Sequence, residues 1–140
     1  MSRAALIGYT GFVGSALARQ RHFDCAHNSR SIDEIAGERF DFVVCAGAPA
    51  TMWAANAQPT ADAANLFRLF KALRSAEIGK LILISTIAVF DDVSAGYTER
   101  SANFEIVKPY GRNRRELDPV FLRPGPRAHA TSTRQLVTPA

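Results

Sequence analysis

The first residues of this sequence that could do chemistry form a glycine-rich turn near the amino terminus. Gly8, Gly11 and Gly14 recur at every third position, directly after the apolar run Ala4–Ile7. Glycine lets a backbone turn tightly and approach a ligand without a Cβ in between. A helix that begins at such a turn offers free N–H groups and a positive dipole end to a pyrophosphate. We therefore predict a strand, a ligand-binding turn and a helix.

The spacing of these glycines differs from two better-known phosphate sites. It is Gly-x-x-Gly-x-x-Gly, whereas standard dinucleotide sites have Gly-x-Gly-x-x-Gly. A P-loop needs a lysine after its last glycine, and this chain has Ser15 there. The P-loop interpretation is excluded, and a plain strand-to-helix connection without a ligand is the alternative.

Two further groups of polar side chains could act on a substrate. Ser85 and Thr86 end an apolar run, and Tyr110 precedes Arg114 by about one helical turn. A phenol has a pKa of about 10, too high for a base at neutral pH. A fixed cation one turn away favours the phenolate and lowers that value. Each group alone is also typical of a strand end, a surface tyrosine or a solvated basic face.

Alternating strands and helices must position these residues. Apolar runs that predict strands lie over 4–7, 23–28, 40–46 and 80–86. Patterns that predict helices lie over 12–20, 31–35, 59–76 and 109–117. In the longest helix, Thr60 is the expected N-cap and Gly79 the closing residue. Trp53 is expected in a preceding loop, buried against this helix. The alternation indicates an α/β fold with a parallel sheet and right-handed crossovers.

The order and spacing of these motifs resemble the extended short-chain dehydrogenase/reductase family, also called the NAD-dependent epimerase/dehydratase family. That family has a Gly-x-x-Gly-x-x-Gly turn, a strand ending in Ser-Ser/Thr-x-x-Val-Tyr, and then Tyr-x-x-x-Lys. The counterparts here are the glycine turn, 85–90 and 110–114, within about residues 4–117. The resemblance implies a doubly wound parallel sheet of the Rossmann type with a nicotinamide dinucleotide across its carboxyl edge.

The resemblance also implies roles for individual residues. Thr86 matches the residue that hydrogen-bonds the reacting oxygen, and Tyr110 matches the general acid/base. Arg114 stands where the family has lysine; it keeps the charge but is bulkier and planar. Together these three are the expected catalytic residues. The residues expected to contact the dinucleotide are Gly8, Thr10, Gly11, Phe12, Val13, Gly14, Asn28, Arg30, Ala46, Gly47 and Ala48.

The end of the second predicted strand bears on cofactor choice. An acidic residue there binds the adenosine ribose of NAD, whereas arginine accommodates the extra phosphate of NADP. This chain has Asn28 and Arg30 and no carboxylate until Asp33, which favours NADP over NAD. The implied reaction is oxidoreduction at a carbinol or ketone, of the epimerase/dehydratase kind. The implied substrate is a small molecule such as a nucleotide-linked sugar.

The carboxy-terminal part of the chain departs from the family. We expect one incomplete dinucleotide-binding domain over 1–123, without a separate substrate domain, and a basic, poorly ordered tail over 124–140. Of the 17 basic and 13 acidic side chains, residues 108–140 hold 7 and 2. The tail lacks interleaved aromatic residues, so nucleic acid is not the expected partner. These features favour a truncated member of the family.

Composition limits the remaining possibilities. The chain has 47% hydrophobic and 21% charged residues, as in soluble globular proteins. It has no apolar run of membrane-spanning length and no signal-peptide layout, so a cytoplasmic protein is the default. It also has no metal-ligand spacing, so no metal is expected. A homodimer is compatible with the sequence. The alternatives to an enzyme are a non-catalytic dinucleotide-binding fragment without a substrate half, and an anion- or nucleic-acid-binding protein that acts through the tail.

Overall fold

A parallel sheet forms the centre of the molecule. The computed structural model describes residues 2–48, 52–85, 109–114 and 135–136. Within them, the strands are β1 (Ala4–Ile7), β2 (Cys25–His27), β3 (Arg39–Cys45), β4 (Glu77–Ser85) and β5 (Gln135–Leu136). They pair in the order β2-β1-β3-β4-β5, and every pairing is parallel. The carboxyl ends of the strands therefore share one edge of the sheet.

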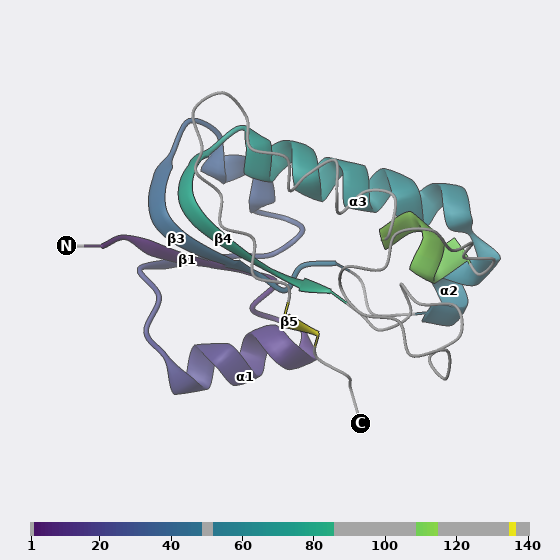
Figure 1. Cartoon of the computed structure of the whole chain (residues 1–140), viewed down its shortest axis with the longest axis horizontal. Helices are drawn as coiled ribbons and strands as arrows, with labels where there is room; N and C mark the ends of the chain where they lie inside the picture. Colours follow the sequence, from purple (N-terminus) through teal and green to yellow (C-terminus); the bar gives the residue numbers. More distant parts are fainter. Residues whose placement is uncertain (1, 49–51, 86–108, 115–134, 137–140) are drawn as a thin grey trace.

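Helices cover both faces of this sheet. The connecting elements are α1 (Phe12–Gln20), the 3-10 helix η1 (Ile32–Ile35), α2 (Met52–Ala57) and α3 (Pro59–Arg74). Figure 1 shows α1 on one face and α3 on the other. The chain runs outward from β1 to β2, crosses back to β3 and continues to β4, so the direction of winding reverses between β1 and β3. This doubly wound arrangement confirms the predicted fold class.

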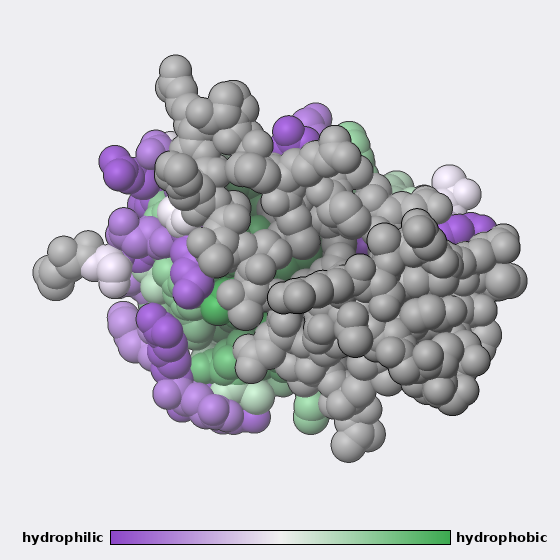
Figure 2. Space-filling view, viewed as in Figure 1, coloured by the Kyte–Doolittle hydropathy of each residue, from purple (hydrophilic) through white to green (hydrophobic). Residues whose placement is uncertain are grey.

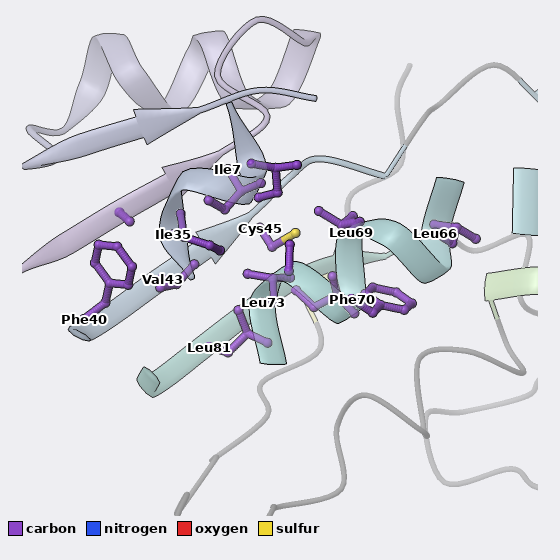
Figure 3. Close-up of a cluster of buried hydrophobic side chains, with 14 residues drawn as sticks. Ile7, Ile35, Phe40, Val43, Cys45, Leu66, Leu69, Phe70, Leu73 and Leu81 are labelled. Atoms are coloured by element: carbon purple, nitrogen blue, oxygen red, sulfur yellow. The ribbon is translucent and has the colours of Figure 1, made fainter. Parts of the chain in front are cut away.

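The apolar stripe of α3 closes the core over the sheet. Leu66, Leu69, Phe70 and Leu73 recur at helical spacing and all are buried. All four belong to one cluster with apolar side chains of the strands, and Figure 3 shows Leu69 and Leu73 lying toward those side chains. The strand residues labelled there are Ile7, Phe40, Val43, Cys45 and Leu81. Packing on both faces of the central strands explains why their sequences are almost entirely apolar.

The amino end of the sheet carries charged side chains. Arg3 pairs with Glu38 at 2.6 Å between Nη1 and Oε2, and the main-chain N–H of Arg3 donates to Oδ2 of Asp41 at 2.7 Å. Arg39 lies 3.8 Å from Glu77 across β3 and β4. Figure 2 shows hydrophilic residues gathered at this end of the molecule, where the chain begins. Polar contacts therefore occupy the edge opposite the glycine turn.

Several sequence predictions are corrected at the ends of α3. The helix begins with Pro59 at its first position after Gln58, so Thr60 lies inside it and is not the N-cap. It ends at Arg74, and Gly79 belongs to β4. A Cβ on Gly79 would lie 2.9 Å from the carbonyl oxygen of Asp41 on β3. Close approach of two strands, rather than helix termination, explains this glycine.

The prediction for Trp53 is wrong, and two other expectations fall partly outside the described residues. The expected loop around Trp53 contains α2, and this side chain is 77% exposed instead of buried. The helix expected over 109–117 is described over 109–114. In the basic tail, Gln135–Leu136 pairs with the end of β4, while 124–134 and 137–140 lie outside the described residues. No helix among the described residues is long and apolar enough to cross a membrane.

Candidate functional site

The glycine turn lies where the winding of the sheet reverses. Gly8 follows β1 with a φ of 85°, a backbone conformation that residues with a side chain rarely adopt. A Cβ there would overlap the main chain of Ala46 and lie 2.7 Å from the Cα of Gly47. The N–H of Gly8 donates to the carbonyl oxygen of His27 at 2.8 Å, and that of Ala46 donates to Ile7 at 2.8 Å. The turn is therefore fixed to the ends of β2 and β3.

The other two glycines of the turn have different surroundings. A Cβ on Gly14 would overlap the carbonyl oxygen of Gly8, so α1 can pack against the turn only with glycine there. Gly11 has an extended backbone, and its Cβ would meet only the carbonyl oxygen of Gly8, at an ordinary 3.6 Å. Packing within the chain therefore explains Gly8 and Gly14 but leaves Gly11 unexplained. Close approach of a ligand would explain it.

The first turn of α1 presents main-chain donors at this place. The first intrahelical bond runs from Ser15 N–H to the carbonyl oxygen of Gly11 at 2.8 Å, and no side chain caps the helix. The preceding N–H groups, on Phe12, Val13 and Gly14, belong to the turn that lacks intrahelical acceptors. The Phe12 side chain is 82% exposed, and Thr10 is exposed beside it. This arrangement fits a bound diphosphate.

The segment after β3 completes the same site. Ala46, Gly47 and Ala48 follow the last core residue of β3 and are half-buried. A Cβ on Gly47 would lie 3.1 Å from the side chain of Ile7 and 3.4 Å from that of Leu69. The structure thus brings together the glycine turn and the small residues that the sequence placed there.

The loop after β2 lies beside the turn. Oδ1 of Asn28 accepts from the N–H of Arg30 at 2.9 Å, and the N–H of Asn28 donates to Oγ of Ser31 at 3.2 Å. These bonds close the loop and leave Arg30 exposed. Nδ1 of His27, at the end of β2, is buried and has no hydrogen-bond partner among the described residues. Asn28 therefore shapes the loop, and Arg30 is the cation that it presents.

Two carboxylates close to this loop in sequence are already engaged. Oδ2 of Asp24 accepts from the N–H of Ala4 at 2.7 Å, at the amino end of β1. Asp33 pairs with Arg68 of α3 at 2.8 Å. Neither carboxylate lies at the end of β2, where an acidic residue could bind the adenosine ribose.

Tyr110 and Arg114 lie together on the helix over 109–114. The guanidinium carbon of Arg114 is 3.7 Å from the centre of the Tyr110 ring, and its Nη1 donates to the Tyr110 carbonyl oxygen at 3.0 Å. Both residues are buried. The N–H of Tyr110 donates to Oδ1 of Asn56 on α2 at 2.9 Å. Figure 1 shows this short helix beside α2 and the start of α3, on the side toward which the strands point.

A third residue, which sequence reasoning missed, completes this group. Asp62 on α3 is 5% exposed, and its two oxygens bind Arg114 at 2.8 Å and 3.1 Å. Asn113 donates to Asp62 at 2.9 Å and to the carbonyl oxygen of Pro59 at 3.0 Å. A signal was present in the sequence, because Asp62 lies in register with the apolar stripe that begins at Leu66.

Thr86 lies outside the described residues, so its contacts are not described, and β4 ends at the preceding Ser85. The described residues contain no group of His, Cys, Asp and Glu that could hold a metal ion. Burial raises the pKa of the Cys25 thiol, and Cys45 is buried in the core. A thiol with a raised pKa is a poor nucleophile at neutral pH.

Comparisons with known proteins identify the fold. No protein-family model and no curated protein matches the chain. It is similar to RMD from Pseudomonas aeruginosa, solved with NADPH: the TM-score is 0.71 at 18% identity, over 96% of this chain and 52% of that one. It is similar to the UDP-Glc/GlcNAc 4-epimerase from Campylobacter jejuni, with a TM-score of 0.68 at 17% identity, over 86% and 48%.

A third solved structure agrees with these two. The dTDP-4-dehydrorhamnose reductase from Bacillus anthracis, in complex with NADP, has a TM-score of 0.62 at 21% identity, over 86% of this chain and 49% of that one. The chain thus spans about half the length of the solved structures that it matches. The likeness confirms the fold that the motif resemblance implied.

Proposed function

We propose that this chain binds a nicotinamide dinucleotide at the glycine turn. The observation that carries the proposal is Gly11, whose lack of a side chain the packing of the chain does not require. It lies at the uncapped start of α1, where the winding of the sheet reverses. Open α/β sheets bind ligands at such a place, outside the carboxyl ends of the strands.

Each part of the site has a proposed task. The N–H groups of Phe12 and Val13 would hold the pyrophosphate, and Thr10 would contact it beside them. Gly8 and Gly14 allow the turn to form. The segment 46–48 would border the adenosine side. Small side chains there keep the backbone accessible to a flat ligand.

NADP is the proposed form of the cofactor. Arg30 is exposed at the end of β2, in a loop that Asn28 closes. The nearby carboxylates of Asp24 and Asp33 are bound elsewhere. A guanidinium pairs well with a phosphate, whereas a carboxylate would be needed for the ribose hydroxyls of NAD.

The proposed reaction is oxidoreduction or epimerisation of a nucleotide-linked sugar. Tyr110 would exchange a proton with the reacting substrate oxygen, and Thr86 would hydrogen-bond the same oxygen. Arg114 would provide the positive charge next to the tyrosine ring. The bound nicotinamide supplies hydride transfer. The neighbours named above, which are epimerases and reductases, support this class of reaction.

A second candidate is a dinucleotide-binding protein without turnover. One observation favours it: the guanidinium of Arg114, which stands where the resembled family has lysine, is bound to Asp62. Both candidates need the same cofactor site. Turnover of UDP-glucose with NADP, lost in Tyr110→Phe, would separate the enzyme from the binder.

The test of the cofactor site uses two glycine variants. Fluorescence titration of the whole chain should show binding of NADPH, with weaker binding of NADH. In Gly11→Ala, the added methyl makes only an ordinary contact within the chain, so the unfolding midpoint should fall only by the modest cost of alanine in place of glycine at the N-cap of α1. NADPH affinity should fall at least about tenfold, because the methyl stands between the turn and the diphosphate.

The matched control is Gly37→Asn. Gly37 also lies in a turn, with a φ of 75° that asparagine tolerates, and a Cβ there would meet nothing within 4 Å. It lies between η1 and β3, away from the glycine turn, so NADPH binding should be unchanged. Absence of binding by the wild type, or equal affinity in Gly11→Ala, would refute the proposed site.

A further inference from the structure

A buried polar cluster joins α3 to the helix over 109–114. Asp62, Asn113 and Arg114 are each less than a tenth exposed. Asp62 accepts bonds from both terminal nitrogens of Arg114 and from the amide of Asn113. Buried charges are tolerated only when they are paired and hydrogen-bonded, as these are. The cluster therefore fixes the position of the guanidinium.

The same guanidinium fixes Tyr110. It lies against the face of the phenol ring, with 3.7 Å between its carbon and the ring centre, and Nη1 also donates to the Tyr110 carbonyl oxygen. A cation over a ring face is attracted by the negative face of the ring, and more strongly when both are buried. Asp62 thus acts on the tyrosine through Arg114.

This geometry also explains why arginine stands at position 114. The side chain meets Asp62 with two nitrogens, meets a carbonyl oxygen and covers a ring at the same time. A planar guanidinium has the donors and the flat face for all of these contacts. A lysine ammonium is a single point and cannot make the paired contact with both carboxylate oxygens.

The structure assigns Asp62 the role of a positioning residue that holds the Tyr110 ring in place through Arg114. This inference rests on the proposed function for its catalytic meaning. It makes Arg114 a clamp on the tyrosine, not a contact to the cofactor. The described ionisable side chains of this cluster are Tyr110, Arg114 and Asp62; Asn56 and Asn113 are neutral, and Arg112 is exposed.

The first test needs no activity. Protons above a ring face are shifted upfield in NMR spectra, so the whole chain labelled with 15N-arginine should show an upfield guanidinium signal. Its absence from Arg114→Lys assigns it to Arg114, and its return to an ordinary position in Tyr110→Leu shows that the ring causes it. In Asp62→Asn the signal should lose its upfield shift, because the variant removes the charge that fixes the guanidinium.

Two further variants separate the clamp from a general loss of structure. Asp62→Glu keeps the carboxylate and should restore most of the upfield shift. Asp33→Asn is the matched control, because it breaks an exposed pair with Arg68 on the same helix, also at 2.8 Å. It should leave the signal unchanged. If Asp62→Asn does not fold, Asp62→Glu carries the test below its unfolding midpoint: its upfield shift should be smaller than that of the wild type, and an identical shift would overturn the inference.

The second test measures the catalytic meaning. With UDP-glucose and NADP as probes, Asp62→Asn should lower kcat about 100-fold, the size expected for a displaced reacting group. The dissociation constant of NADPH should not change, and Asp62→Glu should recover part of kcat. An upfield signal that persists in Asp62→Asn overturns the inference. A wild type that has this signal but binds no NADPH overturns the proposed function instead and leaves the clamp in place.

Discussion

The three glycines of the turn are glycine for different physical reasons. Gly8 is required by its backbone conformation and by the nearby main chain of Ala46. Gly14 is required because a Cβ would overlap the Gly8 carbonyl oxygen. Gly11 has neither reason. As the N-cap of α1, Gly11 could equally be serine, asparagine or aspartate, so close approach of a ligand explains best why it is glycine.

At the residue scale, Arg30 should decide between the two cofactors. Arg30→Ala should weaken NADPH binding about 10- to 100-fold, because a bond to a charged phosphate is worth about 1.5–3 kcal/mol. NADH binding should change by less than about twofold, because that molecule lacks the phosphate. Titration of the wild type and of Arg30→Ala with both cofactors, at fixed salt, checks this. An equal loss of affinity for NADPH and NADH would mean that Arg30 contacts another part of the ligand.

The residues of the turn could be predicted from the sequence, whereas the buried pair between Asp62 and Arg114 could not. A turn is a local object, and its glycines, strand and helix are contiguous. The pair between Asp62 and Arg114 joins residues 52 positions apart. Only the folded chain shows which cation meets a carboxylate on the buried side of a helix. The roles of Thr86, Tyr110 and Arg114 remain predictions.

Long periodic segments could be predicted from the sequence, whereas helix ends, a short helix and contacts between segments could not. The helix and its apolar stripe follow from spacing alone, and both are confirmed in α3. The prediction that Gly79 ends the helix is wrong. This residue is glycine because a Cβ would lie too close to the Asp41 carbonyl oxygen on another strand. The short α2 was missed because six residues are too few for a periodic pattern.

The buried and the exposed face of α3 should contribute differently to stability. Leu73 is buried in the core, whereas Phe67 on the same helix is 63% exposed. Leu73→Ala should lower the free energy of unfolding by about 2–5 kcal/mol, because it leaves a cavity. Phe67→Ala should change it by less than about 0.5 kcal/mol. Urea unfolding measures both. Similar losses for the two variants would mean that the outer face of α3 is covered as well.

At the scale of the whole molecule, the two edges of the sheet differ in what they can bind. Charged side chains at the amino edge are paired with each other, as Arg3 is with Glu38. The carboxyl edge instead holds an uncapped helix start and an exposed arginine. Exposed pairs contribute little to stability. An anion bound at the carboxyl edge would contact the start of α1 and the exposed arginine, and would stabilise the turn, β1 and α1 together.

Stability should consequently depend on the cofactor concentration. A ligand that binds only the folded chain adds about 2.7 kcal/mol when its concentration is 100 times the dissociation constant. Thermal unfolding of the wild type should therefore shift upward continuously with NADPH, and less with NADH at equal concentration. In Gly11→Ala the midpoint without ligand should fall slightly, because alanine is a poorer N-cap than glycine, while the upward shift is lost. A shift of equal size in both proteins would place the dinucleotide away from the turn, because a methyl at Gly11 cannot weaken a site that it does not touch.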